Sequence, residues 1–272
     1  MTSCGAIADL VRAFLDIVAR LLIYVLKMKA IVLCAGSGRR LRPLTGDRPK
    51  CLLRIGGRTI LEFCLDNLEA AGIHDVVLVT GYERALVERL ARVRDGNRIS
   101  CVVNENFAST NTAVSLRLAL SHMDDDFILI NGDVLFEGSI LLDLLANPDP
   151  NGVVVDAGIL LGAEEVKVMA RNGRLLKISK ELEPRQCQGE AIGIYKISRN
   201  LVCDLVRIYA ELERNGEFHH YFEKGFERIL EAGGDESRMF GLSFTRGRPW
   251  AEIDTLEDYE NARREIYPKI LL

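Results

Sequence analysis

The stretch KAIVLCAGSGRRLRPLTGDRPK, residues 29–50, decides how this chain folds. It opens on a short apolar run, 29–34, which is typical of a buried strand, and continues into a loop with glycines at 36 and 38. Two glycines let backbone N–H groups approach an anion closely. The carboxyl end of a first parallel strand is also where α/β sheets bind ligands. The stretch therefore predicts an anion-binding loop at the edge of an α/β sheet.

The same loop is strongly basic, although the chain as a whole is acidic. The 272-residue chain has a net charge of −4, so it has no general electrostatic attraction to nucleic acid or to anionic membranes. Five cations nevertheless lie close together in the loop, namely Arg39, Arg40, Arg42, Arg48 and Lys50. This placement indicates a small phosphate-bearing ligand, and no nucleic-acid partner is expected.

The composition is that of a globular chain. Hydrophobic residues make up 48% and charged residues 27%, which excludes bulk disorder. The 7 cysteines are scattered without a C-x-x-C pair, so neither a disulfide framework nor a structural zinc site is expected. We therefore predict reduced thiols and a cytoplasmic location.

Strand and helix signals alternate along the first half of the chain. The predicted strands are 29–34, 75–80, 99–103 and 127–130, and the predicted helices are 59–71, 85–93 and 111–121. This order implies an α/β fold with a mostly parallel central sheet between layers of helices.

The second half of the chain changes character after residue 150. Strands are expected at 152–156, 191–197 and 239–244, and helices near 199–213, near 219–232 and from 255 onward. Between them, 166–178 alternates around Asn172-Gly173, the strongest short signal for a β-hairpin. We expect this half to continue the same domain with an inserted hairpin.

Residues 1–27 look unlike the rest. Charges at Asp9, Arg12, Asp16 and Arg20 recur at three- and four-residue steps, which places them on one stripe of a helix. The apolar run 21–26 is far too short to span a bilayer, and no basic region precedes it as in a signal peptide. We predict an N-terminal amphipathic helical extension and no integral membrane span. The alternative is that the protein starts at Met28.

The basic loop is neither of two well-known phosphate motifs. A dinucleotide fingerprint would need glycine where Leu41 stands, and the Gly-Lys-Ser/Thr of a P-loop is missing. The pattern G-x-G-x-R-L-x-P-L-T-x-x-x-P-K over 36–50 instead resembles the signature of the nucleotidyltransferases that make sugar nucleotides and related activated phosphoesters. The resemblance implies a single Rossmann-like nucleotidyltransferase domain over 28–272.

The resemblance also implies site roles. In that family the glycine loop cradles the nucleotide triphosphate, Arg40 would contact the phosphates, and Lys50 would stabilise charge at the reacting phosphorus. These two residues are the catalytic candidates, and such transfer needs positioning and charge neutralisation rather than a covalent nucleophile. The expected nucleotide-binding residues are Leu33, Ala35, Gly36, Ser37, Gly38 and Arg39 in the loop, and Thr80, Gly81, Tyr82, Asn104, Thr110 and Asn111 after the next two strands.

Nucleotidyl transfer also calls for a divalent cation held by carboxylates. Asp133 ends the strand 127–130 in Asn-Gly-Asp, and Asp254 stands ahead of the last helix. Taken alone, Asp133 could be a turn residue and Asp254 could cap that helix. The resemblance implies that both are metal ligands, with Mg²⁺ as the expected cofactor.

The acceptor region decides the substrate. The segments 164–168, 178–182 and 189–193 resemble the small cytidylyltransferases that act on phosphocholine, related phospho-alcohols, phosphonates or inositol phosphate. The acceptor-binding candidates are Lys167, Lys180, Glu190, Tyr221 and Trp250. The two lysines could instead be hairpin residues facing water, whereas the aromatic pair could contribute to a cage around a quaternary ammonium.

The expected function is transfer of a cytidylyl group from CTP to a small phosphorylated alcohol or phosphonate, with release of pyrophosphate. One alternative is a sugar-1-phosphate nucleotidyltransferase that uses UTP, dTTP or GTP. Another is a catalytically silent, nucleotide-binding regulatory subunit. A homo-oligomer is compatible with any of these.

Overall fold

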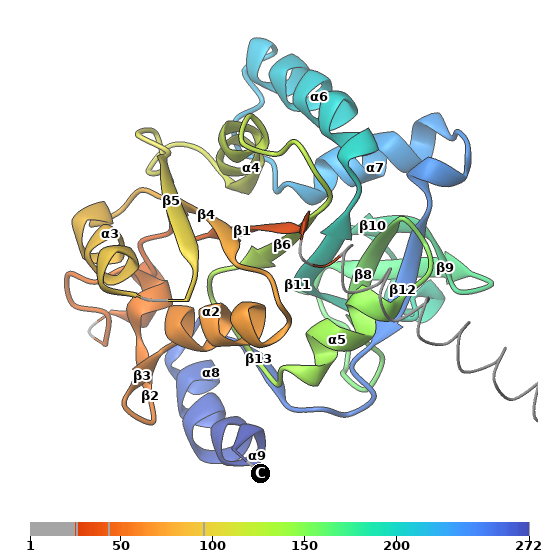
Figure 1. The fold of residues 1–272 in the computed structure, drawn as a ribbon. Coiled ribbons are helices and arrows are strands. Elements are labelled where there is room, and N and C mark those ends of the chain that lie inside the picture. Colours follow the sequence, from red (N-terminus) through yellow and green to blue (C-terminus); the bar gives the residue numbers. More distant parts are fainter. Residues whose placement is uncertain (1–24, 26, 43, 95, 272) are drawn as a thin grey trace, which may run out of the picture.

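A computed structural model describes residues 25, 27–42, 44–94 and 96–271 (Figure 1). In this part of the chain, nine strands form one central sheet. In spatial order they are β5 (Arg98–Val103), β4 (Asp75–Thr80), β1 (Lys29–Leu33), β6 (Phe127–Asn131), β11 (Gly189–Ile197), β8 (Asn151–Asp156), β12 (Phe240–Phe244), β10 (Arg174–Ser179) and β9 (Lys167–Arg171).

The sheet has a parallel half and a mixed half. Strands β5, β4, β1 and β6 are all parallel, as expected for strands joined through helices. Strand β11 then runs antiparallel to both β6 and β8, and β9 and β10 form the antiparallel hairpin predicted around Asn172-Gly173. The expectation of a mostly parallel sheet therefore describes the first half, and the complete sheet is mixed because a hairpin connection reverses the strand direction.

Helices cover both faces of the sheet (Figure 1). Their bounds are α2 (Ile60–Ala70), α3 (Arg84–Val93), α4 (Thr112–Leu120), α5 (Ser139–Ala146), α6 (Val202–Arg214), α7 (Glu223–Ala232), α8 (Leu256–Asn261) and α9 (Tyr267–Ile270). Alternate residues of β1 face opposite layers. Ile31 and Leu33 pack in the cluster with α4, α6 and α7, whereas Ala30 and Val32 pack in the cluster with α2 and α5.

Two short strands that the sequence analysis did not anticipate position the carboxylates. β7 (Val134–Phe136) directly follows Asp133 and pairs antiparallel with β13 (Trp250–Glu252). The Ile253 amide donates a hydrogen bond of 3.1 Å to the Asp133 carbonyl. Two segments that are far apart in the sequence are thereby held side by side next to the end of β6.

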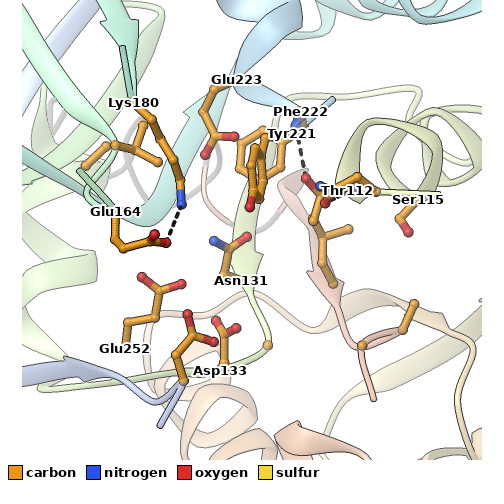
Figure 2. A pocket seen from close by; sticks show the side chains of 18 of the residues that line it. Thr112, Ser115, Asn131, Asp133, Glu164, Lys180, Tyr221, Phe222, Glu223 and Glu252 are labelled. Atoms are coloured by element: carbon orange, nitrogen blue, oxygen red, sulfur yellow. Dashed lines mark hydrogen bonds and ion pairs between the residues drawn. The ribbon is translucent and has the colours of Figure 1, made fainter. Parts of the chain in front are cut away.

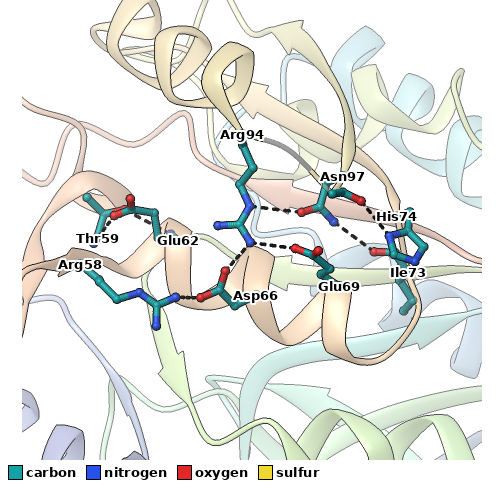
Figure 3. A network of polar contacts seen from close by, with 10 residues as sticks. Arg58, Thr59, Glu62, Asp66, Glu69, Ile73, His74, Arg94 and Asn97 are labelled. Atoms are coloured by element: carbon teal, nitrogen blue, oxygen red, sulfur yellow. Dashed lines mark hydrogen bonds and ion pairs between the residues drawn. The ribbon is translucent and has the colours of Figure 1, made fainter.

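A charged cluster fastens α2 to the connection between α3 and β5 (Figure 3). Arg94 donates to the carboxylates of Asp66 and Glu69 on α2 and, at 3.3 Å, to the side chain of Asn97. Asn97 in turn donates at 3.3 Å to the carbonyl of Ile73, which follows the turn after α2. These bonds fix the position of α2, which is the first α-helix after the basic loop in the sequence.

The predicted extension over 1–27 lies outside the described residues, apart from Val25 and Lys27. Val25 is buried and its carbonyl accepts a 3.0 Å hydrogen bond from the Met28 amide. In the described part of the chain, no helix combines the length and the apolar character that crossing a membrane requires. The cysteines in that part are free thiols, and a reducing cytoplasm stays a prediction.

Candidate active site

The basic loop folds back so that its last residue, Lys50, lies next to Gly38. Gly38 has φ 60°, a left-handed conformation that favours glycine, and a Cβ there would stand 3.1 Å from the Cβ of Lys50. A 3₁₀ turn, Arg39–Leu41, follows and buries Leu41 as an anchor. A second 3₁₀ turn, Lys50–Leu52, begins where the loop ends. The loop therefore directs Lys50 inward while Arg39 stays exposed.

Lys50 and Arg40 meet the two predicted metal ligands. The Lys50 ammonium lies 2.6 Å from Asp133 and also bonds Asp254, and the Arg40 guanidinium lies 2.7 Å from the other oxygen of Asp254. Burial alone would lower the pKa of Lys50, but the two carboxylates raise it above its ordinary value. The same cations hold the pKa of Asp254 below its ordinary value, although burial opposes this. The four residues singled out for catalysis and metal binding thus form one charged cluster.

A third carboxylate joins this cluster. One carboxyl oxygen from each of Asp133, Glu252 and Asp254 lies within 4.8 Å of the other two. One oxygen of Asp133, Oδ1, is buried and has no hydrogen-bond partner among the described residues. Burial, with Asp133 and Asp254 nearby, raises the pKa of Glu252 to about 8. Three crowded carboxylates with an unsatisfied oxygen fit a hard divalent cation, which prefers oxygen ligands.

Arg40 and the three carboxylates lie at the floor of a cavity of about 540 Å³, whereas Lys50 does not line the cavity itself and is bonded to two of these carboxylates. The cavity opens at the carboxyl ends of β1 and β6, the position expected for a ligand site in an α/β sheet. Thirteen of the predicted site residues line it: Leu33, Ala35, Gly36, Arg40, Asn104, Thr110, Asn111, Asp133, Lys180, Glu190, Tyr221, Trp250 and Asp254. Residues from both halves of the chain therefore meet around one space.

Asn104, a predicted nucleotide-binding residue, organises the loop after β5. Its side chain is buried and donates to the hydroxyls of Thr110 at 3.1 Å and Ser115 at 3.0 Å. Its carbonyl oxygen accepts from the Asn106 amide at 3.0 Å. With its polar atoms bonded in this way, Asn104 shapes the wall of the cavity rather than presenting a free edge to it.

Several predicted nucleotide-binding residues do not line the cavity. Ser37, Gly38 and Arg39 belong to the basic loop, whereas Thr80, Gly81 and Tyr82 lie behind Ala35 and Phe107. Thr80 is fully buried, and a Cβ at Gly81 would stand 2.8 Å from Phe107. Contact of these residues with a nucleotide stays a proposal, and the structure gives the second group a role in supporting the loop.

Lys180 and Tyr221 form part of the opposite wall (Figure 2). The Lys180 ammonium lies 4.7 Å from the centre of the Tyr221 ring and 3.7 Å from the carboxylate of Glu164. Lys167, the other predicted lysine, is only 2% exposed, and its ammonium donates to the carbonyls of Glu165 and Lys180. Lys167 therefore supports the segments that carry Glu165 and Lys180 and does not line the cavity.

The same wall carries buried carboxylates. Tyr195 donates a 3.0 Å hydrogen bond to Glu223, while the buried Glu190 carboxylate makes no hydrogen bond or ion pair with another side chain among the described residues. Burial raises the pKa of Glu223 to about 7, and burial together with Glu165 and Asp156 raises the pKa of Glu190 to about 7. Trp250 is oriented by its indole N–H, which donates to Asp156. This wall is therefore acidic, with an exposed tyrosine on one side.

Figure 2 shows how the two groups of carboxylates are separated. Asp133 and Glu252 lie on one side of Asn131, and Glu223, Tyr221 and Lys180 lie on the other. Sequence reasoning missed Glu252, Glu223 and Asn131 as cavity residues. Glu252 could have been found, because residues two apart on an extended segment share a face and Glu252 is two before Asp254. Glu223 gave no such signal, since an acid in the first turn of a helix is ordinary.

The raised pKa of Glu223 predicts a pH-dependent stability. Its folded value of about 7 lies above the ordinary 4.5, so its contribution is complete at low pH and is lost as the pH rises through 7. Between pH 5 and pH 8 the unfolding free energy of the wild type should fall relative to that of Glu223→Gln by about 2 kcal/mol. Urea unfolding at both pH values measures this difference. The same substitution at Glu231, which is exposed on α7, should leave the unfolding free energy with the pH dependence of the wild type. The same pH dependence in the wild type and in Glu223→Gln would contradict the prediction.

The architecture and the site define a nucleotide-handling domain, and comparison with known proteins identifies its family. The sequence model of the family described as the MobA-like NTP transferase domain matches residues 30–180, which is more than half of the 272-residue chain. The chain belongs to this family.

Relatives and solved structures of the same kind match most of the chain. CMP-5'-(3-aminopropyl)phosphonate synthase of Streptomyces rubellomurinus is 41% identical over 251 residues, covering 89% of this chain and 39% of that protein. CTP:phosphoglutamine cytidylyltransferase of Campylobacter jejuni is 24% identical over 256 residues, covering 86% and 98%. The inositol-1-phosphate CTP transferase structure from T. maritima matches with a TM-score of 0.74 and 23% identity, covering 89% and 95%, which supports the fold alone.

The chain is shorter than some of these relatives. It spans 39% of the length of the Streptomyces protein and 57% of the bifunctional protein GlmU of Methanococcus vannielii, to which it is 31% identical.

Proposed function

We propose that this protein transfers a cytidylyl group from CTP to a small phosphonate or phosphorylated alcohol and releases pyrophosphate. The observation that carries the proposal is the cluster of Lys50, Arg40, Asp133 and Asp254 at the floor of the cavity. Phosphoryl-type transfer depends on positioned cations and on carboxylates that hold a metal, and this cluster supplies both. The names of the phosphonate and phosphoglutamine relatives support CTP as the donor.

Each part of the cluster has a task in this reaction. The backbone of the glycine loop and Arg40 would bind the triphosphate, and Lys50 would neutralise charge that develops around the α-phosphorus. Asp133, Asp254 and Glu252 would hold Mg²⁺, which when bound neutralises phosphate charge. An oxygen of the acceptor would attack the α-phosphorus in line as pyrophosphate leaves, so no covalent enzyme intermediate is needed.

The opposite wall would select the acceptor. Lys180 is placed to bind the acceptor's anionic group, whereas Glu190 and Glu223 suit a cationic group at its other end. The Tyr221 ring already faces the Lys180 ammonium, so it is less free to cage a quaternary ammonium. An aminoalkyl phosphonate or phosphate, as in the name of the Streptomyces relative, therefore fits better than a choline ester.

A pyrophosphate-release screen tests the proposal. CTP, UTP, dTTP and GTP are each offered with aminoethylphosphonate, phosphocholine, inositol phosphate and hexose 1-phosphates, in the presence of Mg²⁺. We expect turnover with CTP and a phosphonate or phospho-alcohol, and highest kcat/KM for acceptors with a primary amine. Turnover confined to hexose phosphates with another nucleotide would replace the proposal with a sugar-1-phosphate enzyme. Tight nucleotide binding without turnover would indicate a regulatory subunit.

A further inference from the structure

The first turn of α4 is joined by hydrogen bonds to the segment 218–222. The backbone N–H of Asn111 donates to the Phe218 carbonyl at 2.9 Å, and that of Ala113 donates to the His220 carbonyl at 3.3 Å. The Asn111 side chain donates to the His219 carbonyl at 3.1 Å. We refer to this contact between 111–113 and 218–222 as the seam.

One bond of the seam is made by a threonine hydroxyl. The Phe222 amide donates to the Thr112 hydroxyl at 3.0 Å, as the dashed line in Figure 2 shows. Phe222 is only 1% exposed, so its amide has little access to water as a substitute partner. Loss of the hydroxyl would leave a buried donor unsatisfied, and the local backbone would have to shift to satisfy it.

The seam connects the two sides of the cavity. On one side it continues the loop of Asn104 and Thr110, which belongs to the proposed nucleotide side. On the other side, Phe222 is flanked in sequence by Tyr221 and Glu223, which line the acceptor wall. The centre of the Phe222 ring also lies 5.3 Å from the centre of the Tyr195 ring, and Tyr195 donates a hydrogen bond to Glu223. A displacement of Phe222 would therefore move both residues of the wall.

We propose that Thr112 is a positioning residue through which the seated nucleotide aligns the acceptor wall, so that each substrate strengthens binding of the other. The proposal rests on the proposed function, because it needs a nucleotide and an acceptor in the two halves of the cavity. The coupling is reciprocal: CTP raises the affinity for the acceptor by the same factor as the acceptor raises that for CTP.

The test compares Thr112→Val, which removes the hydroxyl, with Thr112→Ser, which keeps it. For valine we expect the acceptor KM at saturating CTP and the CTP KM at saturating acceptor to rise together, each about tenfold, while kcat and the affinity for either substrate alone change much less. Calorimetry with aminoethylphosphonate, with and without the non-reacting analogue α,β-methylene-CTP, measures the coupling directly. The analogue should tighten acceptor binding about tenfold in the wild type and in Thr112→Ser, and hardly at all in Thr112→Val.

Controls separate this proposal from its rivals. Ser121→Ala removes an exposed hydroxyl bond at the far end of α4 and should leave every parameter unchanged. Acceptor binding that weakens equally with and without the analogue in Thr112→Val would mean a direct contact and overturn the proposal. An undiminished coupling in Thr112→Val would also overturn it. A wild type without turnover for any substrate pair would instead refute the proposed function.

Discussion

Replacing Lys50 with methionine should lower kcat about 1,000-fold, because it removes the cation that is proposed to neutralise charge at the reacting phosphorus. Methionine keeps the apolar stem in its buried position, so the loop should still fold over Gly38. The loss should appear mainly in kcat, since the triphosphate retains Arg40 and the backbone of the loop. Pyrophosphate release at saturating CTP and acceptor measures the effect.

A matched lysine provides the control. Lys29 begins β1, at the opposite end from the basic loop, and its ammonium pairs with Asp124 at 2.6 Å. Lys29→Met should keep wild-type turnover, because an ion pair with so exposed a partner contributes little. A Lys50→Met protein that is folded by circular dichroism and turns over at a near-normal rate would remove the basis of the catalytic assignment.

Removal of the divalent cation should have an effect of similar size. Chelation of metal should abolish turnover, and added Mg²⁺ should restore it. Asp254→Asn should weaken metal binding at least about tenfold, equivalent to about 1.4 kcal/mol, because a charged ligand becomes neutral. It should also lower kcat about 100-fold, since Lys50 and Arg40 lose their shared partner. Mn²⁺ binding followed by electron paramagnetic resonance measures the affinity independently of activity.

Two further variants define the metal site. Glu252→Gln should weaken Mn²⁺ binding as well, because its carboxylate belongs to the same cluster. Asp124→Asn changes a carboxylate that is 81% exposed and should leave Mn²⁺ binding unaltered. Full activity in the presence of excess chelator, or unchanged Mn²⁺ affinity in Asp254→Asn, would refute the predicted cation site.

The local signals in the sequence were sufficient for most of the framework. The apolar run before the glycine loop became β1, and the Asn172-Gly173 hairpin formed with the strands predicted around it. These features depend on residues close together in the chain, so a single sequence contains their cause. The strand order of the second half depends on which edges pair over long distances, and no local pattern specifies it.

A site residue could be predicted from the sequence where its side chain has suitable chemistry and it directly follows a predicted strand or precedes a predicted helix. Asp133 and Asp254 follow this rule. The spacing of Glu252 to Asp254 is local, but its approach to Asp133 depends on the pairing of β7 with β13. Lys167 shows the opposite case. Its charge suggested a ligand contact, but its neighbours supply backbone carbonyls that satisfy the ammonium inside the protein. Burial of that kind arises from tertiary packing and cannot be read from residue type.

The reversal of strand direction at β11 has an evolutionary consequence. The basic loop and the loops after β4 and β5 come from the parallel half of the sheet, whereas Lys180, Glu190 and Tyr221 come from the mixed half and its following helices. Under the proposed function, a change in the hairpin or the acceptor wall would leave the glycine loop, Lys50 and Asp133 in place, because these residues belong to the parallel half or directly follow it. Such a division would let a domain of this kind change its acceptor while keeping its way of binding a nucleotide.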